Sequence, residues 1–208
     1  MSRAESYRLF SELIAYPTAD LLASAERCRA LIAGRSPAAA GSLDGFISAI
    51  RGRSRSELEE LYARGFDLNP TRCLDLGYQI FGETYKRGSF LVKMKEAARA
   101  HGVDPGTELP DHLPVVLRLL PLLGPEEDPV ELGTEVVLPV IEKLLKSFED
   151  DEGGYRSLFR ALEQLMLGDY GIEVAPPLPF AAPRDGEGAP RKLPMFPGFN
   201  PPTERPWS

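Results

Sequence analysis

The chain has 208 residues, of which 43% are hydrophobic and 26% are charged, and its formal net charge is −7. This length and composition suit a globular protein with one hydrophobic core and at most a short extension. The negative charge argues against a nucleic-acid-binding protein, which needs a concentrated basic surface, whereas basic peptides are suitable partners.

No apolar run reaches the roughly 18 residues of a bilayer-spanning helix, and the N-terminus lacks a basic segment followed by an apolar one. We therefore expect a cytoplasmic protein without stable membrane insertion. The cysteines, Cys28 and Cys73, form no Cys-x-x-Cys pair, so both are expected to be buried free thiols.

Three helices are predicted in the first fifty residues. The first should end before Pro17, because proline disfavours helical geometry in the preceding residue. A second is expected from Thr18 to Gly34, and a linker of small residues should separate it from a short helix over residues 43–50. The first two have helically spaced apolar residues: Leu9, Phe10, Leu13 and Ile14, then Leu21, Ala25, Cys28 and Ile32.

The next region begins with a helix start. Ser54 and Glu57 have the spacing of a capping box, so a helix should begin there and close at Asn69-Pro70. Helical periodicity resumes over residues 74–102 and is interrupted at residues 86–89, which predicts two consecutive helices or one broken helix.

Three more helices are predicted after residue 110. Asp111 is expected to cap a helix that Pro121 kinks, and Asp128-Pro129 should start the next one. The last two predicted helices have the clearest amphipathic stripes in the chain. These are Val137, Val140, Ile141, Leu144, Leu145 and Phe148, then Tyr155, Leu158, Phe159, Leu162, Leu165 and Met166.

The composition changes after Gly171, because residues 172–208 hold half of the twenty prolines. Such a segment favours extended conformations and cannot build its own core. With no period-two strand in the chain, we predict an all-α fold: a single-domain helical bundle over residues 1–171 and an irregular proline-rich extension over residues 172–208. The extension is either an exposed linker or, through residues 193–199, packed on the bundle or on a partner.

The common enzyme motifs are missing from the sequence. There is no phosphate-binding or dinucleotide-binding glycine motif, no His-Glu-x-x-His and no Gly-x-Ser-x-Gly. Two histidines and two scattered cysteines are too few for a closed zinc site. We therefore expect no catalytic residues, no metal site and no cofactor.

The most distinctive segment is Glu-Leu-Pro-Asp-His-Leu-Pro at residues 108–114. It brings two carboxylates, one imidazole and two stiffening prolines into seven residues at a loop-to-helix junction. As an N-cap, Asp111 would use one acceptor position and leave another open, while Glu108 and His112 would be freer to meet a partner. The residues alone allow two interpretations, a structural helix cap or a binding site.

With this segment the chain resembles the NarJ/TorD/DmsD family of cytoplasmic chaperones for molybdenum enzymes, and most closely its nitrate reductase branch. The resemblance extends over residues 5–168 and includes Leu-Ile-Ala-Tyr-Pro at 13–17, residues 57–62 and Phe66-Asp67. It is closest at residues 108–114, which resemble the family's hinge motif. Residues 74–82 depart from the aromatic–acid–histidine stretch typical of that branch, and the proline-rich extension is not part of the family pattern.

The resemblance implies a TorD-like helical fold and a function without catalysis. Such chaperones bind the N-terminal segment of a molybdoenzyme catalytic subunit, often a twin-arginine export signal, and hold the apoenzyme until the molybdenum cofactor is inserted. Nitrate reductase or a relative would be the client, and a homodimer is an open alternative to a monomer. The motif residues Glu108, Pro110, Asp111 and His112 would bind the client peptide.

Four residues before the motif, namely Asp75, Tyr78, Glu83 and Tyr85, are candidates for one wall of the same groove. Carboxylates there could orient the arginines of a bound peptide. For the two tyrosines, packing in the core is the alternative.

Two other classes of function stay open at this point. The chain could be a small nucleotide-hydrolysing enzyme that uses Glu108, Asp111 and His112. It could also be a helical scaffold that acts through its proline-rich extension.

Overall fold

A computed structural model of the chain describes residues 3–149 and 152–178. Within these ranges all regular structure is helical, apart from an isolated antiparallel bridge between Asp75 and His112. The prediction of an all-α fold is confirmed. In the same ranges, no helix is both long enough and apolar enough to cross a membrane.

The α-helices are α1 (Arg3–Ile14), α2 (Leu21–Ile32), α3 (Pro37–Ile50), α4 (Arg55–Tyr62), α5 (Leu76–Phe81), α6 (Tyr85–Ala100), α7 (Leu113–Leu119), α8 (Pro129–Glu131), α9 (Leu138–Ser147) and α10 (Tyr155–Tyr170). Two π-helical turns continue neighbouring helices, η1 (Ala63–Asp67) after α4 and η5 (Leu132–Val137) between α8 and α9. Short 3₁₀ turns are η2 (Pro70–Arg72), η3 (Leu120–Leu122), η4 (Pro125–Glu127) and η6 (Glu152–Gly154).

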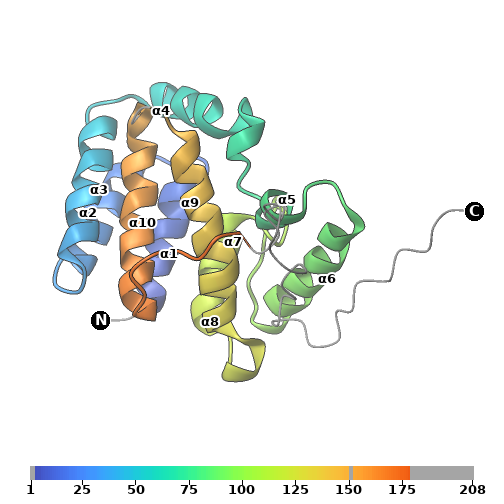
Figure 1. Cartoon of the computed structure of the whole chain (residues 1–208). Coiled ribbons are helices and arrows are strands. Elements are labelled where there is room, and N and C mark those ends of the chain that lie inside the picture. The colour runs from blue at the N-terminus through green and yellow to red at the C-terminus, as the bar shows by residue number, and fades with distance from the viewer. Residues whose placement is uncertain (1–2, 150–151, 179–208) are drawn as a thin grey trace, which may run out of the picture.

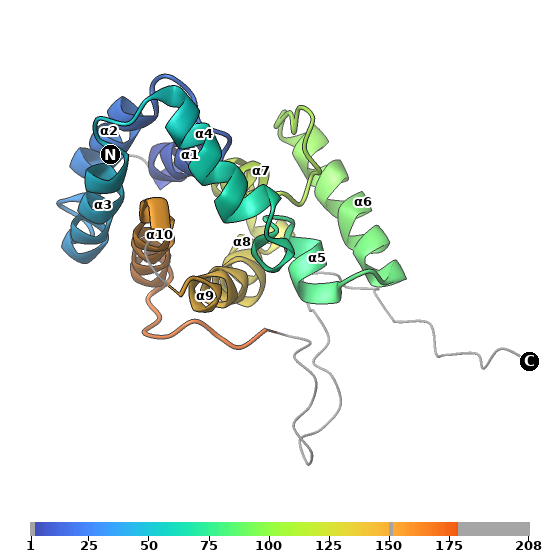
Figure 2. The same ribbon diagram turned by 90° about the horizontal axis from the view of Figure 1, so that it is seen from above.

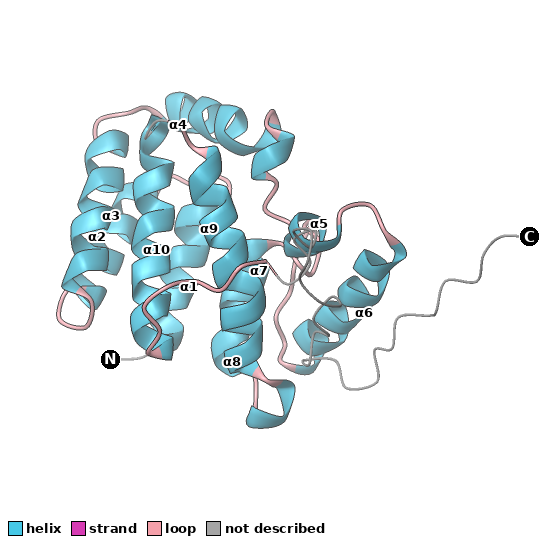
Figure 3. Ribbon diagram, in the orientation of Figure 1, coloured by secondary structure: helices cyan, strands magenta, loops and turns pink. Residues whose placement is uncertain are grey.

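The helices form a bundle with a smaller helical pair beside it (Figures 1 and 3). In the bundle, α10 lies against α3 and α9, and α1 lies against α2 and α7. Every apolar residue of the two predicted amphipathic stripes is buried in this core. Seen from above, α5 and α6 lie to one side of the bundle, and α6 packs chiefly against α5 (Figure 2).

Several predicted boundaries are wrong. The expected linker before residue 43 is the first part of α3, because Pro37 suits the first turn of a helix and alanine has the highest helix propensity. Helix α2 begins at Leu21 and not at Thr18. The interruption between α5 and α6 lies at residues 82–84, where Gly82 adopts φ +57°, and residues 86–89 belong to α6.

The helix-start predictions have mixed outcomes. The capping box is confirmed, because Ser54 Oγ accepts from the Glu57 amide at 3.3 Å and a Glu57 oxygen accepts from the Ser54 amide at 2.7 Å. A helix begins at Pro129 as predicted, but Asp128 has a left-handed backbone and its side chain makes no cap hydrogen bond. At Pro121 the α-helix has already ended, and the chain continues as the turn η3.

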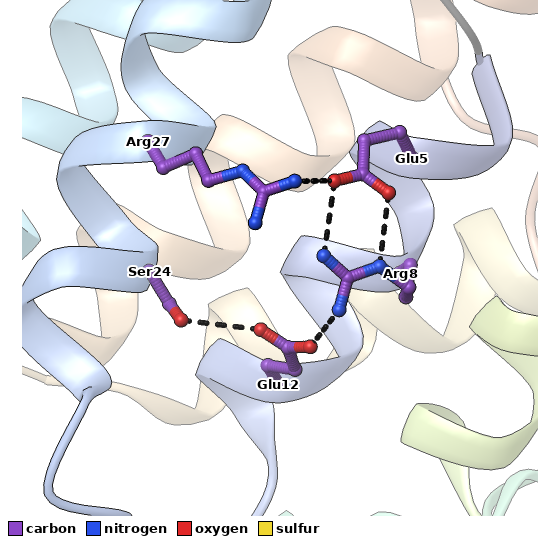
Figure 4. Close-up of polar contacts among 5 residues, drawn as sticks. All are labelled: Glu5, Arg8, Glu12, Ser24 and Arg27. Carbon is purple, nitrogen blue, oxygen red and sulfur yellow. Dashed lines mark hydrogen bonds and ion pairs between the residues drawn. The ribbon is translucent and has the colours of Figure 1, made fainter.

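A surface network of charged side chains joins α1 to α2 (Figure 4). Glu5 accepts hydrogen bonds from Arg8 at 2.9 and 3.0 Å and from Arg27, while Ser24 donates to Glu12 at 3.1 Å. Exposed pairs of this kind contribute little to stability individually, but here they connect two helices at several points.

Both cysteines are free thiols, as expected, but only Cys28 is fully buried. Cys73 is half-buried because it lines a surface cleft. Of the proline-rich extension, residues 172–178 are described, and Ala175 is buried. The segment 193–199 lies outside the described residues, so its expected packing stays a prediction.

Candidate functional site

The 108–114 segment crosses the start of α5 and is paired with it through the backbone. The amide of Leu76 donates to the carbonyl of Asp111 at 3.0 Å, and the amide of Leu113 donates to the carbonyl of Leu74 at 2.9 Å. These two hydrogen bonds hold the N-terminus of α7 against that of α5.

Asp111 caps α5 and not α7, contrary to the prediction. Its Oδ2 accepts a hydrogen bond from the amide of Gly77 at 2.8 Å, across 34 residues of sequence. The N-cap of α7 is His112, whose side chain makes no cap hydrogen bond. The local prediction failed because backbone pairing with α5 places the Asp111 carboxylate beside an amide of that helix.

The carboxylate of Asp111 is completely buried. Burial raises its pKa to about 6, and the nearby negative charge of Asp75 acts in the same direction. The Gly77 amide and the positive charge of Arg87 oppose this rise. Its second oxygen, Oδ1, has no hydrogen-bond partner in the described part of the chain.

His112 was expected to be free to contact a partner, and this expectation is wrong because the residue is largely buried. Only 9% of the residue is exposed, and burial lowers the pKa of its imidazole, which favours the neutral form at pH 7. Its Nδ1 lies 3.9 Å from a Glu108 oxygen, which is too long for a hydrogen bond. The Glu108 side chain, in contrast, is 56% exposed.

Four predicted site residues line one cleft of about 400 Å³: Asp75, Tyr78, Glu108 and His112. The cleft lies between η1, the segment before α5, the first turn of α6 and the 108–112 segment. Its other lining residues are Tyr62, Phe66, Asp67, Asn69, Pro70, Cys73, Leu74 and Arg87.

The other predicted residues do not line this cleft. Asp111 is buried, and Pro110 lines a neighbouring cleft. Glu83 and Tyr85 lie at the connection between α5 and α6, where both are exposed.

The structure adds three important residues to the cleft that were not predicted as site residues. The π-helical turn η1 continues α4, burying Phe66 and leaving Asp67 exposed. Arg87 donates to Asp75 at 3.0 Å, and its guanidinium lies 5.4 Å from the centre of the Tyr78 ring. The only sequence signal for Phe66 and Asp67 was their place in the family resemblance, and Arg87 fell in the predicted interruption.

The charges of the cleft are mainly negative. Asp67, Asp75 and Glu108 contribute carboxylates, and Arg87 contributes one guanidinium. Among the described residues Asp67 makes no hydrogen bond or ion pair, and the only ion-pair contact of Glu108 is the one of 3.9 Å to His112, whose lowered pKa favours the neutral form at pH 7. With His112 neutral, neither Asp67 nor Glu108 is paired with a positive charge, so the cleft offers two unpaired carboxylates to a cationic ligand.

A second, mostly apolar cleft of about 580 Å³ lies between the end of α6 and residues 102–110. Its lining includes the apolar residues Ala98, Val103, Pro105 and Pro110, and also the charged residues Lys95, Arg99 and Asp104. Glu108 lines both clefts, so the acidic and the apolar surfaces adjoin. Over the described residues, no group of three or more histidines, cysteines and carboxylates is placed to hold a metal ion.

The fold and these clefts define an all-helical protein with an acidic surface site beside an apolar one. The chain is similar to "Nitrate reductase molybdenum cofactor assembly chaperone NarJ" of Escherichia coli strain K12, with 32% identity over 105 residues. The match covers 50% of this chain and 44% of that protein, and the protein of the same name from strain O157:H7 gives the same values.

The chain thus spans less than half the length of the curated relatives that it matches. No protein-family model matches the sequence. The resemblance to the NarJ branch that the motifs indicated is confirmed by this similarity.

Proposed function

We propose that this chain is a cytoplasmic assembly chaperone for the catalytic subunit of a molybdoenzyme, with nitrate reductase or a close relative as the client. It would bind an N-terminal segment of the apo subunit and hold the subunit until the molybdenum cofactor is inserted. The observation that carries this proposal is the similarity to NarJ over half of the chain.

The adjoining clefts support this proposal with a plausible chemistry for binding. The unpaired carboxylates of Asp67 and Glu108 can accept charge-assisted hydrogen bonds from arginine or lysine side chains of a client segment. The apolar cleft on the other side of Glu108 can take the apolar residues of the same segment. Electrostatic attraction would orient the segment, and apolar burial would add affinity.

The roles of the 108–112 residues differ in this proposal. Glu108 would contact the client directly, because it is exposed and lines both clefts. Asp111 would act indirectly, since its buried carboxylate holds the start of α5 and thereby the cleft wall. His112 would contribute a neutral surface to the cleft and no charge at pH 7.

The same charges disfavour nucleotide hydrolysis at this cleft. A nucleoside triphosphate is a polyanion and would be repelled by the unpaired carboxylates of Asp67 and Glu108. Of the three acid–base candidates, Asp111 is completely buried against Gly77. The alternative of a scaffold that acts through the proline-rich extension depends mainly on residues outside the described ranges.

Co-purification from the native cytosol tests the proposed function. The protein should be isolated from cells grown with molybdate and from cells deprived of molybdate, in which the molybdenum cofactor cannot be completed. We expect a molybdoenzyme catalytic subunit to co-purify, and more of it from the molybdate-deprived cells, because the subunit lacks its cofactor there. Recovery of no such subunit under either condition would contradict the proposal.

A further inference from the structure

Arg87 occupies the acidic cleft much as a cationic ligand would. It belongs to the first turn of α6, and its guanidinium donates to Asp75 at 3.0 Å. The side chains of Arg87 and Asp75 are only 22% and 20% exposed. The guanidinium also lies 5.4 Å from the ring centre of Tyr78, within the range of a cation–π contact.

The sequence leaves room for this arrangement at Gly77. A Cβ atom at this position would lie 3.3 Å from Cγ of Arg87 and 2.6 Å from Oδ2 of Asp111. A larger residue would therefore push the arginine stem and the buried carboxylate away from α5. The ion pair with Asp75 and the ring of Tyr78 hold Arg87 in the cleft, and Gly77 leaves space for it because it has no side chain.

We infer that Arg87 is a built-in competitor for the cationic side chains of a client, because it occupies Asp75 and leaves only Asp67 and Glu108 open. This inference rests on the proposed function, since it concerns the ligand of the same cleft. The ion pair lowers the negative charge that a basic segment meets and so limits how tightly the cleft binds basic peptides in general.

The alternative role for the pair is purely structural, as a link between α5 and α6. The two roles predict different signs for the substitutions of the two partners. A structural link is lost equally in Arg87→Gln and Asp75→Asn, so both would weaken binding. If Arg87 competes with the client, Arg87→Gln makes the cleft more negative and Asp75→Asn makes it less negative, so their effects are opposite.

The test is calorimetric titration with a synthetic 15-residue peptide that carries two arginines before an apolar stretch. At low salt we expect Arg87→Gln to bind roughly fivefold tighter than the unsubstituted protein and Asp75→Asn roughly fivefold weaker. The double variant should return close to the original affinity. All three differences should shrink at high salt, because screening weakens interactions between partly exposed charges.

A matched ion pair far from the cleft provides the control. Arg29 donates to Asp44 at 2.7 Å between α2 and α3, so Arg29→Gln and Asp44→Asn make the same changes in net charge. Neither control should change peptide affinity by more than about twofold at this distance. Thermal unfolding of each variant shows whether it is folded, and Arg87→Lys, which keeps the charge, should bind less tightly than Arg87→Gln.

The outcomes separate the inference from the proposed function. If the unsubstituted protein binds the peptide and the two cleft substitutions change affinity in the same direction, or not at all, the inference is wrong and the proposed function stands. If neither the unsubstituted protein nor any variant binds the peptide, the proposed binding function of the cleft fails together with the inference.

Discussion

Asp111 carries an ionisable group into a completely buried position, so its effect on stability depends on pH. Burial and the charge of Asp75 raise its pKa to about 6 in the folded protein, above the ordinary value of 3.8 for an aspartate. The folded state therefore holds this proton more tightly than the unfolded state does. The resulting stabilisation is complete below about pH 4 and is lost as the pH rises through about 6.

Replacement of Asp111 by asparagine should remove this dependence. The amide oxygen can still accept from Gly77, and no charge has to be buried. At pH 7.5 we expect the free energy of unfolding of Asp111→Asn, measured by urea unfolding, to exceed that of the unsubstituted protein by about 1–3 kcal/mol. This difference in stability should disappear near pH 4. A gap that is equal at both pH values would contradict this account.

Asp111→Ala is the matched variant that removes the hydrogen-bond acceptor. The buried amide of Gly77 would lose its partner, which costs about 1–3 kcal/mol in proteins. Asp111→Ala should therefore be less stable than Asp111→Asn at every pH between 4 and 7.5.

The unpaired carboxylates of the acidic cleft are the residues that should set affinity for a basic client segment. We expect Glu108→Gln and Asp67→Asn each to weaken binding of the two-arginine peptide by roughly three- to tenfold at low salt. Glu26→Gln, which removes an acid of α2 paired with Arg51 at the end of α3, should leave the affinity unchanged. Calorimetric titration with the same peptide measures the affinity of all three variants. An equal loss of affinity in the Glu26 variant would show that the effect comes from net charge in general.

At the residue scale, the sequence predicted part of the cleft. Asp75 and Tyr78 were predicted as wall residues on the helix before the motif, and Glu108 and His112 as residues of the dense polar segment; all four line the same cleft. The role of Asp111 was misassigned, because its partner at Gly77 lies 34 residues away. No local pattern reports a hydrogen bond of this kind.

The start of α5 is the element that connects the 108–114 segment to the cleft wall. Gly77→Ala should destabilise the protein by about 1–3 kcal/mol, because the new Cβ would lie 2.6 Å from Oδ2 of Asp111 and 3.0 Å from the Phe90 ring. Urea unfolding measures this loss. Loss of the Gly77 hydrogen bond should also reduce peptide binding, since α5 carries Tyr78.

Gly88→Ala is the matched control for this substitution. Gly88 lies in α6 and a Cβ there would meet no atom within 4 Å. Alanine is favoured over glycine in an exposed helix by about 0.5–1 kcal/mol, so this variant should be slightly more stable. If both alanine variants had the same effect, steric crowding at residue 77 would not be the cause.

At the scale of whole elements, local signals located some helix starts and missed others. Ser54 and Glu57 predicted the start of α4 correctly, because a capping box satisfies backbone groups within four residues. No local signal in the sequence marked the π-helical turns η1 and η5. In such a turn each backbone hydrogen bond spans one residue more than in an α-helix, and packing against neighbouring helices accommodates the extra residue. One of them, η1, nevertheless determines where Asp67 lies.

At the scale of the whole molecule, α6 has little support from the bundle, because among the described elements it packs chiefly against α5. Only Phe90, Met94 and Ala98 of α6 are buried, whereas α10 buries residues on several sides between α3 and α9. In native-state hydrogen exchange, we expect amides of α6 to exchange at a lower free energy of opening than amides of α10. Equal protection of the two helices would show that α6 is held as firmly as the core.

The sequence by itself determined the helical class and the core of this protein. Apolar residues at helical spacing specify which face of each helix is buried, and this periodicity is a local property of the chain. The sequence also singled out residues 108–114, and the resemblance of the chain to the NarJ branch is confirmed by its similarity to NarJ.

Only the tertiary structure decided how the polar residues are used. It paired Asp111 with Gly77 and Arg87 with Asp75. In the described part of the chain it left Asp67 without an ion pair and Glu108 with only the contact of 3.9 Å to His112. The physical reason is that burial, pKa shifts and ion pairing depend on groups that are distant in sequence and meet only when α5, α6 and the 108–114 segment are packed together.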